Sequence, residues 1–71
     1  MTTYPKITYC SLDGFPNLLV TYSNGGMVGF EYRGGKWEDV HPADVATKAP
    51  VIGEEKFKER WPDLELPKLR E

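Results

Sequence analysis

The chain has 71 residues, a formal net charge of −2, 28% charged residues and one cysteine. A chain of this length forms one small domain, 1–71, and buries only about 60% of the surface that its unfolded form exposes, so its core has to be compact. The acidic balance disfavours a nucleic-acid surface, which needs clustered cations. Because Cys10 is alone, an intrachain disulfide and a cysteine-based zinc site are excluded.

Targeting signals are not expected in this sequence. No apolar run approaches the roughly 18 residues of a membrane helix. The first residues also lack the basic-then-apolar pattern of a signal peptide. We therefore expect a small acidic cytoplasmic protein with no membrane partner.

The first part of the chain predicts a strand followed by a loop. Residues 6–10 are extended in pattern, and residues 12–17 contain an Asp-Gly pair and a Pro-Asn pair that are typical of loops. The second strand is expected to begin after Pro16, because proline lacks the N–H group that a strand ladder needs.

Residues 18–32 predict a β-hairpin with two candidate registers. A two-residue turn at Asn24-Gly25 would place Val20 opposite Gly29, which leaves apolar side chains without apolar partners. A three-residue loop over 24–26, closed by Gly26 with a positive φ, would place Val20 opposite Phe30. We expect the second register, since burial selects the pairing that keeps one face apolar. The inward-facing side chains are then Leu18, Val20, Tyr22, Val28, Phe30 and Tyr32.

A second hairpin is expected at Gly34-Gly35. A two-residue turn there places Tyr32 opposite Trp37, a stabilising aromatic pair. The same register places Asp39 opposite Phe30, on the apolar face. A bulge near Glu38 or a strand end by Asp39 would remove this conflict, and the alternative is that the carboxylate has a function.

Two short helices and a tail are expected after the strands. Residues 42–48 begin with proline, which the first turn of a helix tolerates, and predict about one helical turn. Residues 53–61 predict a helix with acidic residues in the first turn and Arg60 in the last. Phe57 and Trp61 are four residues apart, so they share one face and are expected to lie across the sheet. Residues 62–71 are expected to be extended or frayed.

Together these elements predict the α+β class. The expected architecture is an antiparallel meander of about four strands with a short C-terminal helix packed on one face. A small SH3-like barrel is the alternative, because short strands with tight turns can close on themselves.

No group of residues in the sequence has the pattern of a catalytic or cofactor site. His41 is the single histidine and precedes Pro42, a position that serves turn geometry. No ligand spacing typical of a metal site is present. Neither glycine pair leads into a helix, as a phosphate-binding loop would. We therefore predict a protein that is not an enzyme, with no catalytic residue, no metal and no cofactor.

The outer face of the predicted sheet is the candidate binding surface. It is fairly apolar for an exposed face, and Gly29 leaves room there for either an aromatic ring of this domain or a partner. The alternative is that the tail, with Leu64, Leu66 and Leu69, covers this face. The edge of the first strand could also pair with a partner strand. The candidate partner-binding residues are Leu19, Thr21, Met27, Gly29 and Glu31.

Residues spread over about half the chain resemble one known family. The pattern Leu18-x-Val20-x-Tyr22-x-Asn24-Gly25, followed by Val40-x-Pro42-x-x-Val45 and by Phe57, is similar to the KTSC domain found beside some lysyl-tRNA synthetases. This resemblance implies a loose link to RNA. The chain departs from the family at Gly34-Gly35, which would be an insertion, and it lacks the small-residue motif expected before the last aromatic residue.

The sequence thus predicts a non-enzymatic protein-binding module, an adaptor or inhibitor of a larger protein whose identity is unknown. Phage-encoded proteins and accessory-gene products of this build, which often block a host enzyme, provide an analogy in size and charge only. One alternative is a nucleic-acid-binding module that stacks bases on sheet aromatics such as Tyr4, Tyr9 and Phe15. Another is a homodimeric structural domain.

Overall fold

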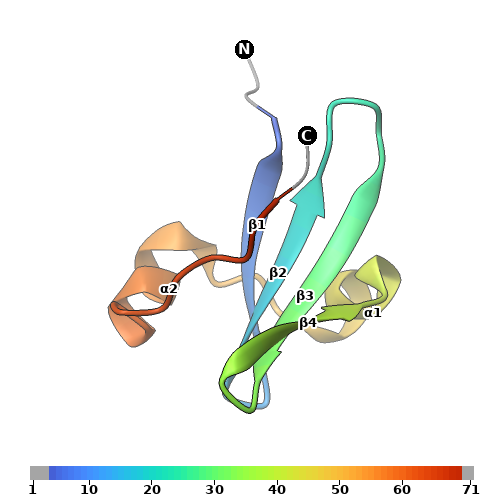
Figure 1. Ribbon diagram of the computed structural model, residues 1–71. Coiled ribbons are helices and arrows are strands. Elements are labelled where there is room, and N and C mark those ends of the chain that lie inside the picture. The colour runs from blue at the N-terminus through green and yellow to red at the C-terminus, as the bar shows by residue number, and fades with distance from the viewer. Residues whose placement is uncertain (1–3, 70–71) are drawn as a thin grey trace.

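The computed structural model describes residues 4–69 and consists of an open antiparallel sheet with two short helices (Figure 1). The strands follow one another across the sheet in chain order. Their bounds are β1 (Lys6–Leu12), β2 (Phe15–Thr21), β3 (Met27–Arg33) and β4 (Lys36–Val40), and the helices are α1 (Pro42–Lys48) and α2 (Gly53–Arg60). This arrangement confirms the α+β meander, and the barrel alternative is not formed.

The turn between β1 and β2 is tighter than the sequence analysis expected. Asp13 and Gly14 have φ angles of 52° and 82°, the left-handed pair that a two-residue hairpin turn requires. The expected loop over 12–17 is therefore wrong, and β2 begins before Pro16. The proline is tolerated because pairing between β2 and β3 begins only at Asn17.

The hairpin between β2 and β3 has a three-residue loop, but one residue earlier than predicted. The Tyr22 N–H donates to the Gly26 carbonyl at 2.8 Å, so the loop is 23–25. The left-handed residue is Gly25, with a φ of 89°, and not Gly26. Both registers considered from the sequence are therefore wrong in their residue pairs.

The predicted faces of this hairpin are nevertheless correct. Val20 lies opposite Val28, and Leu18 lies opposite Phe30. This pairing differs from the expected one by two residues, and side chains alternate between faces with a period of two. The apolar residues of β2 and β3 therefore still share one face.

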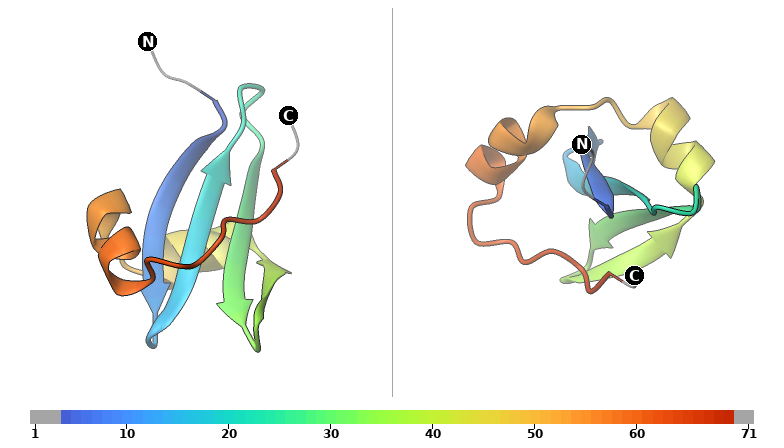
Figure 2. Two further views of the ribbon diagram at one scale, coloured as in Figure 1. Left: turned by 60° about the vertical axis from the view of Figure 1, so that its left-hand side comes forward. Right: turned by 90° about the horizontal axis from the view of Figure 1, so that it is seen from above.

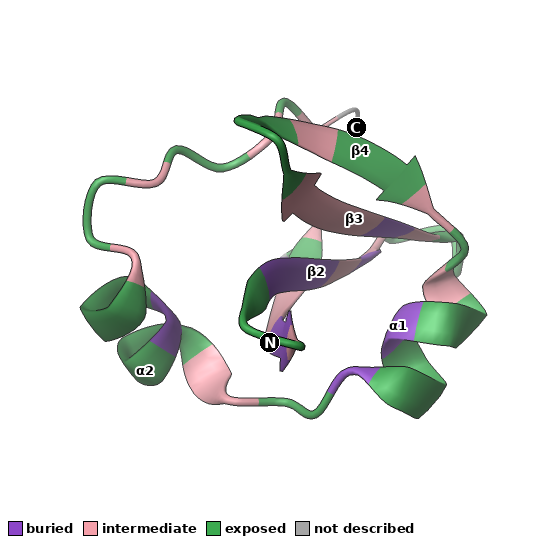
Figure 3. Cartoon of the chain, turned by 90° about the horizontal axis from the view of Figure 1, so that it is seen from below, coloured by how far each residue is buried: buried purple, intermediate pink, exposed green. Residues whose placement is uncertain are grey.

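Helix α2 covers the face that carries Leu18 and Val20, which we call the aromatic face. Phe57 of α2 is buried against these two residues, and Figure 3 shows that α2 has a buried stretch between exposed ones. Its ring also lies 5.1 Å from the ring of Tyr9, centroid to centroid. The predicted packing of this helix on the sheet is thus confirmed.

Helix α1 covers the opposite face, which we call the α1 face. Val45 and Ala49 form a second buried cluster with Cys10 of β1. Gly29 lies directly below the helix, because a Cβ atom there would come within 2.9 Å of Val45 Cγ2. The room left by Gly29 is therefore filled by a helix of this domain, and neither by an aromatic ring nor by a partner.

After a turn at residues 62–63, residues 64–69 run as an irregular segment across the aromatic face (Figure 2). Leu64 and Leu69 pack against the aromatic cluster. The Trp37 indole donates a hydrogen bond to the Glu65 carbonyl at 2.7 Å, which fixes the path of the segment. The tail thus lies on the face opposite to the one considered from the sequence, and its last two residues, 70–71, lie outside the described residues.

Candidate functional site

The five candidate binding residues do not form one open surface. Gly29 is buried below α1, and Leu19 packs against the cluster of Cys10, Val45 and Ala49. Glu31 is partly buried and forms an ion pair with Arg33 at 3.5 Å. Thr21 is partly buried and Met27 is 45% exposed. The expectation that this face is open to a partner is therefore wrong, because α1 covers the centre of the face.

The edge of β1 is also occupied at residues 9–11. The Ser11 N–H donates to the Pro50 carbonyl at 3.1 Å, and the Ile52 N–H donates to the Tyr9 carbonyl at 2.9 Å. Cys10 forms an isolated bridge with Val51 between these two bonds. The segment that joins the two helices therefore takes the place that a partner strand would have at 9–11.

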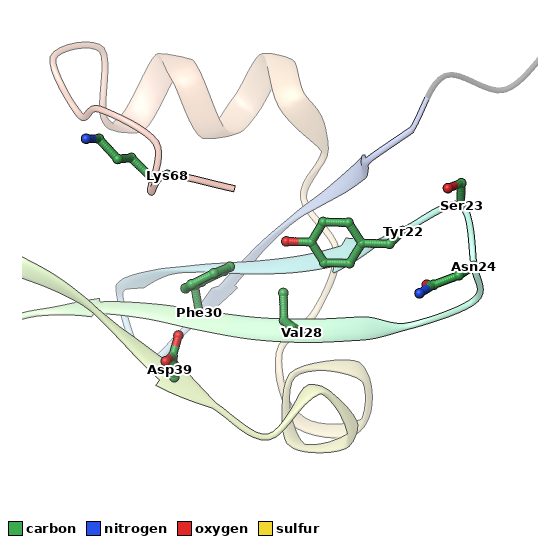
Figure 4. A pocket seen from close by; sticks show the side chains of 7 residues that line it. All are labelled: Tyr22, Ser23, Asn24, Val28, Phe30, Asp39 and Lys68. Carbon is green, nitrogen blue, oxygen red and sulfur yellow. The ribbon is translucent and has the colours of Figure 1, made fainter. Parts of the chain in front are cut away.

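A groove of about 660 Å³ opens on the aromatic face, beside the tail (Figure 4). Its apolar floor comes from Tyr22 of β2 with Val28 and Phe30 of β3. These side chains are only partly buried, in contrast to Leu18 and Val20, which α2 covers. The residues that line the groove are Tyr22, Ser23, Asn24, Val28, Phe30, Asp39 and Lys68.

Asp39 places a carboxylate at this apolar floor. It lies opposite Phe30 in the ladder, as the sequence predicted, and β4 continues without a bulge to Val40. Neither a bulge nor an early strand end therefore explains the charge. Asp39 is exposed and takes part in none of the ion pairs found within residues 4–69.

Lys68 contributes the opposite charge from another part of the chain. It belongs to the tail, whereas Asp39 belongs to an edge strand, and both line the groove (Figure 4). The groove thus combines an apolar floor with a carboxylate and an ammonium group near its Phe30 end. Nothing in the local sequence around Lys68 indicates this, because the position of the tail depends on contacts with Trp37 and the aromatic cluster.

His41 and Cys10, which could carry chemistry elsewhere, have structural roles in this fold. His41 caps α1, since its Nδ1 accepts a hydrogen bond from the Ala43 N–H at 3.1 Å. Cys10 is buried, and burial raises the pKa of its thiol. Within residues 4–69 no group of three or more histidine, cysteine or acidic side chains could hold a metal ion. Neither helix in this range is long and apolar enough to cross a membrane.

The aromatic residues considered for base stacking are separated. Tyr9 packs on Phe57 at the aromatic face. Phe15 lies near the end of the sheet. The Arg33 guanidinium carbon lies over the Phe15 ring, 4.6 Å from the ring centroid. Tyr9 and Phe15 are on opposite sides of the sheet, because the register places Phe15 on the same side as Leu19. They do not form one stacking platform.

Comparisons of the chain with models of protein families, with characterised proteins and with solved structures find no match. The resemblance to the KTSC domain gains no support from these comparisons. What the groove could bind therefore has to follow from its apolar floor and from the charges of Asp39 and Lys68.

Proposed function

We propose that this chain is a non-enzymatic protein-binding module that takes an extended segment of a larger protein into the groove of the aromatic face. The observation that carries the proposal is the Asp39 carboxylate, which is exposed at an apolar floor and has no ion-pair partner within residues 4–69. Because this carboxylate is exposed, it is accessible to a cationic group of a partner that binds at the apolar floor.

The groove chemistry specifies the bound segment. Phe30, Val28 and Tyr22 offer an apolar surface for one aliphatic or aromatic side chain. Asp39 would pair with a basic group on one side of that residue, and Lys68 with an acidic group on the other. The opposite charges of Asp39 and Lys68 would also set the direction in which the segment lies, since electrostatic complementarity determines register more than affinity.

The biological role that fits this module is an adaptor or an inhibitor of a larger protein. Neither role requires a cofactor, and the groove includes no nucleophile paired with a base. A cytoplasmic location accords with a single cysteine kept as a thiol.

Selection of peptides from a random displayed library against the immobilised full chain tests the proposal. Asp39→Lys is the informative variant, because it reverses the charge at the floor of the groove. Glu55→Lys is the matched control, because it makes the same charge change at an exposed position of α2 that does not line the groove. Circular dichroism checks that both variants are folded.

The native chain should enrich peptides with an apolar residue between a basic and an acidic one. Asp39→Lys should replace the preferred basic residue by an acidic one, and Glu55→Lys should leave the motif unchanged. Enrichment of no motif, or of one that both variants alter equally, would contradict the proposal. Salt-dependent binding of single-stranded oligonucleotides without peptide binding would instead support the nucleic-acid alternative.

A further inference from the structure

The outer edge of β4 presents unpaired backbone groups. Arg33 and Lys36 flank a two-residue turn, so they form the hydrogen-bonded pair that closes the hairpin. Because the direction of backbone groups alternates along a strand, Glu38 also points toward β3, whereas Trp37 and Asp39 point outward. Neither outward residue takes part in any backbone hydrogen bond outside the strands and helices of residues 4–69.

The two edges of the sheet are therefore treated differently by this chain. The edge of β1 is covered by residues 50–52 along residues 9–11. Within residues 4–69 no segment forms backbone hydrogen bonds with the outer edge of β4, which carries charged side chains instead. Charges on an edge strand normally prevent pairing with other strands. Here, however, both signs are present, Lys36 at the start and Glu38 and Asp39 after it, so their effect depends on the register of the incoming strand.

A second copy of β4 could pair antiparallel with the first in three registers. In each of them the outward backbone N–H and C=O groups of Trp37 and Asp39 face outward groups of the other copy. Centring the pair on Glu38 places the two Glu38 carboxylates opposite each other, and centring it on Asp39 does the same for Asp39. Centring it on Trp37 places Lys36 of each copy opposite Glu38 of the other. Like charges directly opposite each other are destabilising, whereas opposite charges and aromatic pairs stabilise. Only the register centred on Trp37 is complementary.

A charge relation within one copy also favours this register. Glu38 lies opposite Glu31 in the β3–β4 ladder, which places two carboxylates side by side. Arg33 pairs with Glu31, but no ion pair within residues 4–69 involves Glu38. Lys36 of a second copy would lie on the other side of Glu38 and offset this repulsion. Lys36 and Glu38 are both exposed and free to meet such a partner.

We infer that a second copy of this chain binds at the β4 edge, antiparallel and centred on Trp37, with two Lys36–Glu38 pairs between the copies. The sheet then continues through both copies as one eight-stranded sheet, since each contributes four strands. The groove of each copy remains on its own aromatic face. The inference is therefore independent of the proposed peptide binding, and either one can fail alone.

Sedimentation velocity over a concentration series, with charge-reversal variants, tests the pairing. The native chain should show a concentration-dependent increase to twice the monomer mass. Lys36→Glu and Glu38→Lys should each weaken self-association by about tenfold, because attractive pairs become repulsive ones. The double variant should recover it, and so should an equimolar mixture of the two single variants. Glu55→Lys, off the edge, should have no effect.

Cysteine cross-linking tests the register. In the inferred pairing, positions 36 and 38 of different copies form a close, non-hydrogen-bonded pair, which a disulfide can bridge. A mixture of Lys36→Cys and Glu38→Cys should therefore form heterodimeric disulfides under mild oxidation. The buried Cys10 does not compete.

Two results would overturn the inference. One is a native chain that stays monomeric up to its solubility limit. The other is cross-linking of Glu38→Cys with itself rather than with Lys36→Cys, since this outcome would indicate a pair centred on Glu38.

Discussion

Gly29 allows α1 to lie directly on β3, and alanine at this position tests that packing. A Cβ atom would lie 2.9 Å from the Val40 carbonyl oxygen, 2.9 Å from Val45 Cγ2 and 3.2 Å from Pro42 Cα. Two of these three atoms belong to the backbone. A change of one side-chain rotamer therefore does not relieve the contacts, and the start of α1 has to move away from the sheet.

The expected loss of stability follows from two opposing terms. Overpacking in a close-packed core destabilises by about 1–3 kcal/mol. Alanine in place of glycine restricts the unfolded chain and weakens the strand less, which returns about 0.5–1 kcal/mol. No positive φ is involved at this glycine. Gly29→Ala should thus lower the free energy of unfolding by about 1–2 kcal/mol.

Urea denaturation followed by tryptophan fluorescence measures this change. The control is Val45→Ala, alone and combined with Gly29→Ala. It removes the methyl group that lies nearest to the new Cβ, so the double variant should be less destabilised than the sum of the two single variants. A Gly29→Ala protein as stable as the native chain, or a strictly additive double variant, would refute the close contact between α1 and β3.

Three further predictions concern the tail, the thiol and the helix cap. Trp37→Phe removes the donor to the Glu65 carbonyl and should destabilise by about 0.5–1.5 kcal/mol; unchanged tail resonances in NMR spectra would count against that anchor. Because burial raises the pKa of the Cys10 thiol above its ordinary value of 9.0, the unfolded thiol ionises first as the pH rises. The free energy of unfolding should therefore not depend on this thiol below pH 9.0 and should fall as the pH rises above 9.0. Urea titrations at several pH values measure this fall, and Cys10→Ser should reduce it. His41→Ala removes the acceptor for the Ala43 N–H and should lower the unfolding free energy by about 1 kcal/mol, whereas His41→Asn should retain most of it.

The strands and the faces of the central hairpin could be predicted because they depend on local pattern. Alternating apolar residues in 18–32 define one face, and the glycine pairs define the turns. The exact loop residues could not be predicted, because Gly25 and Gly26 both tolerate a positive φ. An error of two residues in pairing leaves the faces unchanged, which is why the face prediction survived.

The turn at Asp13-Gly14 was within reach of the sequence but was missed. Asp-Gly between two apolar stretches is a strong hairpin signal, and the presence of Pro16 diverted the interpretation toward a longer loop. The structure shows that a proline is acceptable near the start of β2, because β1 pairs there but β3, toward which the proline nitrogen points, does not yet do so.

The groove was only partly predictable. The apolar floor followed from the faces of the first hairpin, and the position of Asp39 opposite Phe30 followed from the register of the second hairpin, which the structure confirms. The proposed outer surface was wrong in its premise because α1 covers it, and one short helix can pack on either face of a sheet without a change in its own sequence pattern.

The sequence by itself determined that residues 18–40 form strands joined by turns, that one of these turns lies at Gly34-Gly35, and that Leu18, Val20, Val28 and Phe30 share a side, because these properties depend on backbone preferences and a two-residue period. Only the tertiary structure decided which segment packs on each face of the sheet. Helix α1 packs above Gly29, and α2 and the tail pack on the aromatic face. That choice depends on burial between segments far apart in the chain. The same long-range packing brings Lys68 and Asp39 to one groove, 29 positions apart in the sequence.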